Sequence, residues 1–326
     1  MPSKLPTILF FEEPSLKPLG PKNSLEIAGC GWDCVFEDKL PAAIALIRSQ
    51  IFEVLVTNSP SLALLNAAKE AHPNIITILV TDAPMHEYTK SLDLRDVEIV
   101  DHIIANLSLE WTLSEIAVTL QKIIRKDFFG IEKYIASGSI IHSIEVKGSS
   151  NREACNNAVS SWIESFGLNR TVSRLASGIS EELVMNAIFD APTAGGSANY
   201  ATLQRSQARE LVSQDCPILR YGADQRLVAI SITDPFGAFK RDTWFTYARK
   251  ILKRNDDTLI DSKSGGAGLG IFKILFGSHA IICNVQPTKI TEVIALISIT
   301  QPIRDFDHMP RSIHYFNTDS HSLTSI

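Results

Sequence analysis

The first half of the chain repeats one pattern: a short apolar run, then a polar tip, in most cases with a proline. The clearest examples are TILFFEEP (7–14), FEVLVTNSP (52–60) and ITILVTDAP (76–84), and WDCVFE (32–37) and EIVDHIIANL (98–107) are weaker ones. Helix-length segments lie between these runs, for example PAAIALIRS (41–49). Strands that alternate with helices indicate a parallel, doubly wound sheet. Residues 1–125 are therefore predicted to form a flavodoxin-like α/β domain, with its functional crevice at the carboxyl ends of the strands.

A stripe of apolar residues follows at helical spacing: Leu109, Leu113, Ile116, Leu120 and Ile123. We expect this helix to pack on the sheet of the first domain through its apolar face. Residues 126–144 are interpreted as a linker. Their apolar residues Ile131 and Tyr134 would extend the helix, either to join the domains or to pair two copies of the chain in a homodimer.

The second half is organised differently, because helical patterns come first and antiparallel hairpins come after. The helical segments are 150–167 and 172–191, and the hairpins are 217–235 and 279–299. A domain of helices layered on antiparallel strands is expected at 145–303. Residues 304–326 are polar and are predicted to be a tail that is disordered or docks weakly.

Composition and charge restrict the functional classes. Of 326 residues, 45% are hydrophobic and 21% charged, the balance of a globular protein. The net charge of −5 and the pI of about 5.9 argue against a nucleic-acid partner held by bulk charge. No apolar run approaches the roughly 18 residues of a membrane span, and the N-terminus has no cleavage pattern of a signal peptide. A cytoplasmic location is expected.

Four glycines crowd the stretch GGAGLG (265–270), which leads into an apolar segment. A P-loop would continue with Gly-Lys-Ser/Thr, but Ile271 and Phe272 follow. In a Rossmann fingerprint counted from Gly266, the third glycine would fall on Ile271, and no strand pattern precedes it. The glycines alone leave two interpretations open: a phosphate-binding turn, or a surface loop without a ligand.

Two other motifs in the same half bear on this choice. In EELVMNAI (181–188), Glu182 and Asn186 are one helical turn apart and share a face. An amide oxygen suits Mg²⁺, and a carboxylate can accept a proton from an attacking hydroxyl, although most such pairs are only solvated helix faces. In ISITDPFGAF (230–239), Asp234 ends a strand and could accept a hydrogen bond from the amino group of adenine. An Asp-Pro turn without a ligand is the alternative.

Taken in order, the helix with E-x-x-x-N, the strand ending D-x-x-G and the G-x-G-L-G turn resemble the nucleotide-binding domain of the GHKL superfamily. This superfamily includes gyrase-type ATPases, histidine kinases and bacterial anti-sigma serine kinases. The resemblance covers roughly residues 145–300 and implies a Bergerat-type α/β sandwich with a mixed sheet. ATP would lie between the helices and a lid formed by residues 240–264.

The resemblance also implies a role for each motif residue. Glu182 would be the catalytic base, Asn186 the Mg²⁺ ligand and Asp234 the adenine anchor. The remaining nucleotide-binding positions would be Gly237, Gly266, Gly268, Leu269 and Gly270, the last four near the phosphates at a helix N-terminus. Family members commonly have D-x-G-x-G, whereas this chain has Phe236 and Ala238 at the glycine positions. Either the loop runs differently from that of the family, or these side chains narrow the adenine pocket.

The first domain resembles a response-regulator receiver. Glu12 and Glu13 stand where a receiver has its metal-binding acids, and Thr81 follows the fourth strand. Asn58 occupies the position of the phosphoacceptor aspartate, and the fifth strand ends IIANLS without a lysine. An amide cannot form an acyl phosphate, so the resemblance implies a pseudo-receiver. A plain flavodoxin-like fold with other duties is the alternative.

The expected function is that of a cytoplasmic bacterial signalling regulator. Its GHKL-type domain would bind ATP and Mg²⁺ and phosphorylate a serine or threonine on a protein partner. This partner would be an anti-anti-sigma-like protein, a sigma factor or another signalling protein, as in partner switching. The alternative is a catalytically inactive scaffold that acts by protein–protein interaction. A mechanochemical ATPase is disfavoured, because no transducer pattern follows the last strand.

Overall fold

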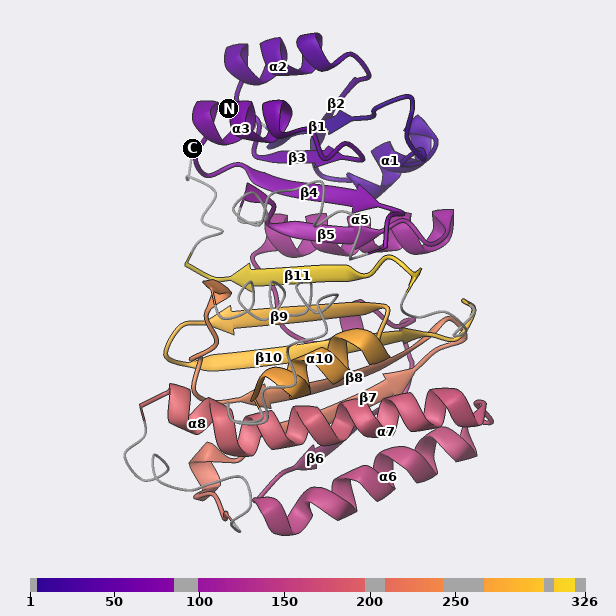
Figure 1. Ribbon diagram of the computed structural model, residues 1–326, viewed down its shortest axis with the longest axis vertical. Coiled ribbons are helices and arrows are strands. Elements are labelled where there is room, and N and C mark those ends of the chain that lie inside the picture. Colours follow the sequence, from indigo (N-terminus) through magenta and orange to yellow (C-terminus); the bar gives the residue numbers. More distant parts are fainter. Residues whose placement is uncertain (1–4, 85–98, 197–208, 243–266, 302–307, 320–326) are drawn as a thin grey trace, which may run out of the picture. The chain divides into compact units, whose positions relative to one another are not determined.

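A computed structural model describes residues 5–84, 99–196, 209–242, 267–301 and 308–319 (Figure 1). The chain forms two compact units. The first unit contains residues 1–128, 308–314 and 318–326, and the second contains residues 129–307 and 315–317. The predicted α/β class is confirmed, because strands pair in parallel in the first unit and antiparallel in the second.

Parallel strands form the centre of the first unit, in the order β2-β1-β3-β4-β5. This is the flavodoxin-like strand order. The residues of β1 and β3 are all buried, as expected for strands covered on both faces. The strands are β1 (Thr7–Phe11), β2 (Asp33–Glu37), β3 (Val54–Thr57), β4 (Ile76–Thr81) and β5 (His102–Ala105).

Two pairs of helices belong to this unit. Helix α1 contacts α5, and α2 contacts α3, the pairing expected of a doubly wound sheet. The helices are α1 (Lys22–Ala28), α2 (Leu40–Ser49), α3 (Leu62–Ala71) and α5 (Leu109–Arg125). In α5 the predicted packing is confirmed for Ile116, Leu120 and Ile123, which are completely buried.

The predicted extension of this helix through the linker is wrong. Helix α5 ends at Arg125, because Lys126 adopts a left-handed conformation with φ of 54°. Ile131 begins a short 3₁₀ turn (Ile131–Lys133), and both Ile131 and Tyr134 are buried within the second unit. Neither residue continues a helical stripe that a second copy could pair with.

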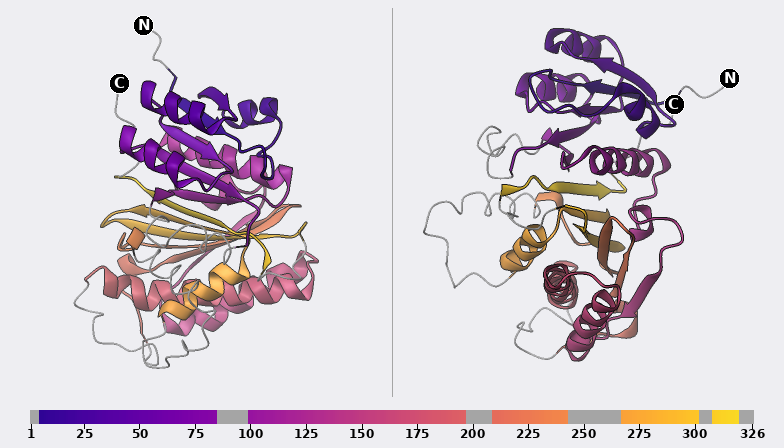
Figure 2. Two further views of the ribbon diagram at one scale, coloured as in Figure 1. Left: turned by 45° about the horizontal axis from the view of Figure 1, so that its top comes forward. Right: turned by 90° about the vertical axis from the view of Figure 1, so that its right-hand side faces the viewer.

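The second unit is an antiparallel sheet with helices layered on one face (Figure 2). Among its described strands the order is β9-β10-β8-β7-β6. They are β6 (Ile141–Glu145), β7 (Ile218–Ala223), β8 (Leu227–Asp234), β9 (Ala280–Gln286) and β10 (Ile290–Ser298). Most residues of β6 had been predicted to belong to the linker (126–144).

Aromatic and aliphatic side chains fix the helices to this sheet. Helix α7 contacts β8 and β10, and α10 contacts α7, β9 and β10. Trp162 of α6 packs against His142 of β6 and Tyr221 of β7. The helices are α6 (Arg152–Ser165), α7 (Arg170–Met185), a π-helical segment (Asn186–Asp190), α8 (Ala191–Ala194) and α10 (Ala267–Gly277).

The predicted polar tail also needs correction. Ser312–Asn317 forms strand β11, and Ile313 and His314 pair antiparallel with Ile103 and His102 of β5. The burial of five of its six residues explains why this segment is ordered although the residues around it are polar. None of the helices described in either unit has the length and apolar character needed to cross a lipid bilayer.

Candidate functional site

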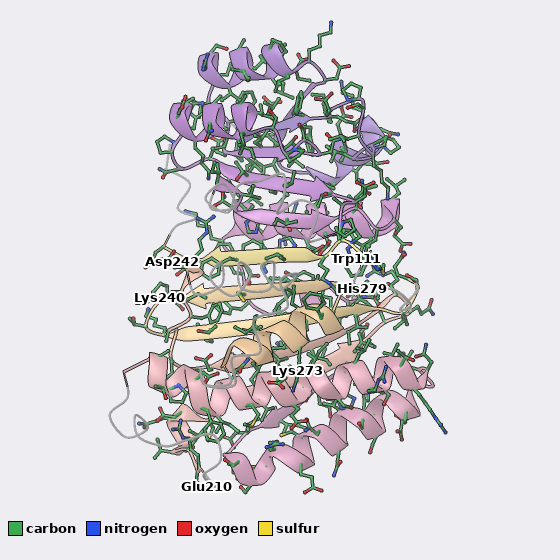
Figure 3. The ribbon with its side chains drawn as sticks, in the orientation of Figure 1. Trp111, Glu210, Lys240, Asp242, Lys273 and His279 are labelled. Carbon is green, nitrogen blue, oxygen red and sulfur yellow. The ribbon has the colours of Figure 1, made fainter. Side chains whose placement is uncertain are left out.

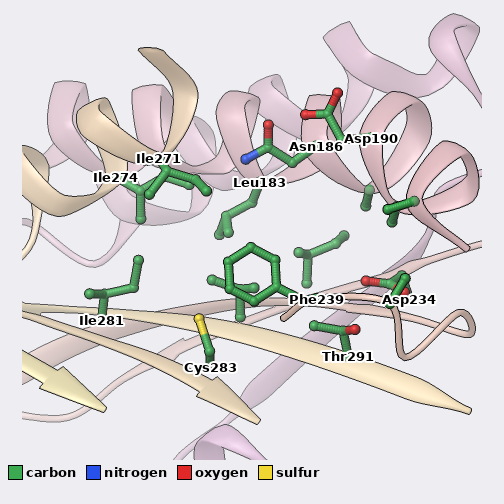
Figure 4. Close-up of a pocket in the computed structure, with 16 residues that line it drawn as sticks. Leu183, Asn186, Asp190, Asp234, Phe239, Ile271, Ile274, Ile281, Cys283 and Thr291 are labelled. Atoms are coloured by element: carbon green, nitrogen blue, oxygen red, sulfur yellow. The ribbon is translucent and has the colours of Figure 1, made fainter. Parts of the chain in front are cut away.

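A cavity in the second unit lies between the helices and the ends of strands β8, β9 and β10 (Figure 4). Its volume is about 160 Å³, whereas one water molecule needs only ~10–15 Å³. Most of the lining is apolar, and the polar exceptions are Asn186, Asp190, Asp234 and Thr291. A mostly apolar hollow with a few convergent polar groups is the usual form of a small-molecule site.

The helical wall of the cavity changes its winding where the predicted Mg²⁺ ligand lies. Asn186 begins the π-helical segment that ends at Asp190, and both residues line the cavity. The buried Arg209 donates from Nη1 to the carbonyls of Ile188 (2.9 Å) and Phe189 (3.3 Å). These bonds satisfy carbonyl groups in the altered segment. Single π turns of this kind are frequent at functional sites.

Helix α10 brings the glycine motif against the E-x-x-x-N pair. A Cβ atom at Gly270 would lie 2.7 Å from Oε2 of Glu182 and 3.1 Å from Oδ1 of Asn186. A side chain at position 270 would therefore force these groups apart. Lys273, one turn further along α10, donates from Nζ to Oε1 of Glu182. Glu182 is thus contacted from α10 at both of its carboxylate oxygens.

Asp234 lies at the strand side of the cavity. It is the last residue of β8, is only 6% exposed and accepts a hydrogen bond at Oδ1 from the backbone N–H of Phe236 (3.0 Å). Burial raises the pKa of Asp234 to about 7, although the backbone N–H groups of Phe236 and Gly237 act in the opposite direction. A carboxyl group with this pKa changes its charge near neutral pH.

Thr291 of β10 is the register partner of Asp234, and both side chains line the cavity. Its Oγ1 is buried and has no hydrogen-bond partner among the described residues. A buried hydroxyl without a protein partner can donate to or accept from a water molecule or a ligand in the cavity. The sequence analysis missed Thr291. A signal was present, because a threonine in the second hairpin becomes a partner of Asp234 once the strands are in register.

Of Phe236 and Ala238 in the DPFGAF loop, only Ala238 lines the cavity. The ring of Phe236 lies against Gly195, where a Cβ atom would be 3.1 Å from its Cδ1, and Phe236 does not line the cavity. Ala238 does line it. The larger group is Phe239, whose ring lies between the helices and the strands (Figure 4). Sequence reasoning had not singled out this residue.

Gly237 faces a different neighbour from the one expected. Its φ is +57°, and a Cβ atom there would lie 2.3 Å from the carbonyl oxygen of Gln286 and 2.5 Å from the backbone nitrogen of Lys289. Gly237 also accepts a hydrogen bond from the N–H of Thr288 (3.2 Å). The residue therefore lets two backbone segments approach, and it does not line the cavity that Asp234 faces.

The other glycine-motif residues can be placed only in part. Gly268 and Leu269 belong to the first turn of α10 as described, next to Gly270. Gly266 and residues 243–264 of the proposed lid lie outside the described residues. Backbone N–H groups in the first turn of a helix have no partner within the helix and can bind an anion.

The chemistry of these groups fits a nucleotide with Mg²⁺. No group of three or more His, Cys, Asp or Glu side chains in the described ranges could hold a metal by itself. Mg²⁺ in nucleotide sites takes few protein ligands and binds mainly to phosphate oxygens and water. The carboxamide of Asn186 beside Gly270 suits that role, and the buried hydroxyl of Thr291 suits a polar atom of a base.

In the first unit, Asn58, which the sequence comparison with receivers placed at the phosphoacceptor position, makes structural hydrogen bonds. Asn58 follows β3 and is 5% exposed. Its Oδ1 accepts from the N–H of Glu13 (2.7 Å), and its Nδ2 donates to the carbonyls of Glu13 (3.3 Å) and Lys17 (3.1 Å). Lys17 in turn donates from Nζ to the carbonyl of Asn106 (2.5 Å). The amide of Asn58 holds the loop after β1 at the carboxyl ends of the strands.

Two of the receiver-like side chains, Glu12 and Thr81, also have local backbone partners. Glu12 accepts at Oε2 from the N–H of Leu19 (2.9 Å). Thr81 is the last residue of β4 and accepts at Oγ1 from the N–H of Ala83 (3.1 Å). Each of these side chains thus stabilises the loop beside it.

No protein-family model matches the chain, and no curated protein matches it. One solved structure that matches is from the crystal structure of the SiaB–SiaC complex of Pseudomonas aeruginosa. The identity is 12%, the alignment covers 55% of this chain and 98% of that chain, and the TM-score is 0.32. A similarity of this size assigns neither a family nor a function to the chain.

Proposed function

We propose that the second unit binds ATP with Mg²⁺ and phosphorylates a serine or threonine of a protein partner in bacterial signalling. One observation carries the proposal. Gly270 of the glycine motif lies directly against Glu182 and Asn186, and Asn186 lines one cavity with Asp234. Residues from three distant segments of the sequence thus lie near one another, and this proximity supports a site for phosphoryl transfer from a nucleotide.

Each group has a distinct task in this proposal. Asp234 and Thr291 receive the adenine ring, whose amino group donates to the carboxylate. The first-turn N–H groups of α10, with Gly268 and Gly270, bind phosphate oxygens. Asn186 offers its amide oxygen to Mg²⁺. ATP supplies the transferable phosphoryl group, and Mg²⁺ neutralises its charge.

Glu182 is the proposed general base. It is buried to 9% exposure on α7, one turn before Asn186, so it would lie next to a hydroxyl directed at the terminal phosphate. The carboxylate accepts the proton of that hydroxyl as it attacks. Its role differs from that of Asn186, which binds rather than activates.

The first unit has a regulatory role in this proposal, as a pseudo-receiver. The strand order supports a receiver-like frame, and the contacts of Asn58 support the loss of phosphorylation. A signal would then reach the protein by another route, such as binding of a partner.

Calorimetric titration with ATP, with and without Mg²⁺, tests the binding step. Asn186→Ala should weaken binding when Mg²⁺ is present and have little effect in a chelator, because the amide acts through the metal. Asp234→Ala should weaken binding under both conditions. Wild-type protein that binds no ATP would refute the nucleotide proposal.

Turnover is tested separately by hydrolysis of ATP and by phosphotransfer to a co-purified partner. Glu182→Gln should abolish both without weakening ATP binding. Glu181→Gln is the matched control, since Glu181 is the adjacent residue and forms an ion pair with Arg152 outside the cavity. Equal loss in the two variants would contradict the role of Glu182.

A non-catalytic scaffold is the second candidate, and one observation favours it. Lys273 donates to Oε1 of Glu182, the residue proposed as the general base, so this oxygen cannot accept a proton at the same time. If that pair persists when ATP is bound, the site binds nucleotide without transferring it. ATP binding by the wild type without hydrolysis or phosphotransfer would favour the scaffold.

A further inference from the structure

Lys273 and Gly270 lie on the same helix and face the same carboxylate. Lys273 projects from α10 (Figure 3). Its Nζ donates to Oε1 of Glu182, while the backbone of Gly270 lies beside Oε2. The helix that contains the glycine motif thus also places a cationic side chain at Glu182. Neither the sequence motifs nor the proposed roles above account for this lysine.

The charges around the cavity explain why a cation matters. The cavity is lined by Asp190 and Asp234, with Glu182 nearby, and no lysine or arginine is among its described lining residues. Acidic groups at the cavity repel a triphosphate, so a cationic side chain would add to the charge neutralisation that Mg²⁺ supplies. The buried Arg209 is directed at backbone carbonyls of the π-helical segment. Lys273 is a cation that contacts one of these acids, Glu182.

The exposure of the two partners shows which of them can move. The side chain of Lys273 is 63% exposed, whereas that of Glu182 is 11% exposed. The ammonium group of Lys273 stays in contact with water, so its own transfer from one anionic partner to another costs little. The flexible four-carbon stem of lysine lets the ammonium group move while the helix stays in place.

We propose that Lys273 binds the terminal phosphate of ATP and is held by Glu182 until the nucleotide arrives. The inference rests on the proposed function, because it takes ATP as the ligand. The ammonium group exchanges the Glu182 carboxylate for a phosphate oxygen. The same movement frees Oε1 of Glu182 to accept a proton from the attacking hydroxyl. Lys273 would thus couple phosphate binding to the release of the base.

The test compares the affinity for ATP·Mg with that for ADP·Mg by calorimetry. Lys273→Met should weaken ATP binding at least about tenfold, the effect of losing a charge-assisted hydrogen bond. ADP binding should change less than about threefold, because ADP lacks the terminal phosphate. Lys273→Arg should restore most of the preference for ATP, whereas a merely structural role would leave the ATP-to-ADP ratio unchanged. Lys147→Met, at an exposed lysine of the same unit, is the matched control.

Glu182→Gln adds a second arm. It removes the competing carboxylate, so ATP binding should become tighter, and Lys273→Met should still weaken it in this background. If the wild type binds ATP and Lys273→Met binds ATP equally well, the lysine inference is wrong and the proposed function stands. If the wild type binds neither nucleotide, the proposed function fails and the inference fails with it.

Discussion

Thr291 on β10 stands directly opposite Asp234 at the end of β8, and both side chains line one cavity although they are far apart in the sequence. Opposite residues of an antiparallel pair have Cβ atoms about 4.5–5.5 Å apart. A single flat ligand can therefore meet both side chains. The hydrogen-bonded sheet, and not a flexible loop, sets their spacing.

The stability of the protein should depend on pH through Asp234. Its pKa in the folded protein is about 7, above the ordinary 3.8, so the folded state keeps a proton that the unfolded chain releases between these values. Stability should fall as pH rises from about 4 to about 7. Asp234→Asn has no titrating group at this position and lacks this loss. Its free energy of unfolding, relative to that of the wild type, should therefore increase by on the order of 3 kcal/mol from pH 4 to pH 8. Urea unfolding at both pH values measures it, and a constant difference would contradict the assignment.

Nucleotide binding should show the opposite trend with pH. The amino group of adenine donates to the ionised carboxylate, so the ligand must displace the proton of Asp234 below pH 7. ATP affinity of the wild type should rise as pH rises from 6 to 8, by at most about tenfold per unit below the pKa. Asp234→Asn should bind weakly at every pH. Titrations in buffers of different ionisation enthalpy would also detect the released proton.

Thr291→Val separates binding from folding. The hydroxyl group has no partner among the described residues, so its removal should leave the free energy of unfolding unchanged or raise it by up to about 1 kcal/mol. ATP affinity should fall roughly 2–10-fold through the lost hydrogen bond. Thr233→Val is the control, because Thr233 lies on β8 immediately before Asp234 and does not line the cavity. Loss of affinity in both variants would point to a general effect on the sheet.

Much of this arrangement followed from local patterns in the sequence. Buried apolar runs predicted the parallel strands of the first unit. Helical spacing predicted that Glu182 and Asn186 share a helix face; Glu182 lies on α7, and Asn186 is the first residue of the π-helical segment that follows it. These features depend on neighbours a few residues away. The meeting of Gly270 with that pair was implied only by the resemblance to a family, because it depends on how α10 packs on α7.

The features that were missed depend on tertiary packing or on one backbone angle. The register of β8 and β10 selects Thr291, and the direction of the DPFGAF loop places Phe239 rather than Phe236 at the cavity. Lys126 ends α5 through a positive φ that its residue type does not favour. Strand β11 forms in a polar segment because its residues pair with β5. No local pattern carries this information.

Asn58→Asp should not restore a phosphorylatable receiver. The new carboxylate would face the carbonyls of Glu13 and Lys17, which now receive hydrogen bonds from Nδ2. Losing these bonds in a buried site should lower the free energy of unfolding by about 2 kcal/mol. Intact mass after treatment with acetyl phosphate and Mg²⁺ should show no phosphoryl adduct. Asn23→Asp, at an exposed asparagine, should stay within ~0.5 kcal/mol of wild type.

Gly237→Ala tests whether this glycine serves the fold or the ligand. The methyl group would collide with the backbone at Gln286, Thr288 and Lys289, at 2.3–2.7 Å. The free energy of unfolding of the variant should fall by more than the roughly 1–2 kcal/mol that a left-handed conformation costs a non-glycine residue. Gly196→Ala is the matched control, since Gly196 also has a positive φ, +72°, but has no atom within 4 Å of the added carbon. Thermal unfolding should therefore show a larger loss at position 237 than at position 196. Equal losses would mean that the hairpin turn yields to the methyl group, and a loss of ATP binding without a loss of stability would return Gly237 to a ligand-binding role.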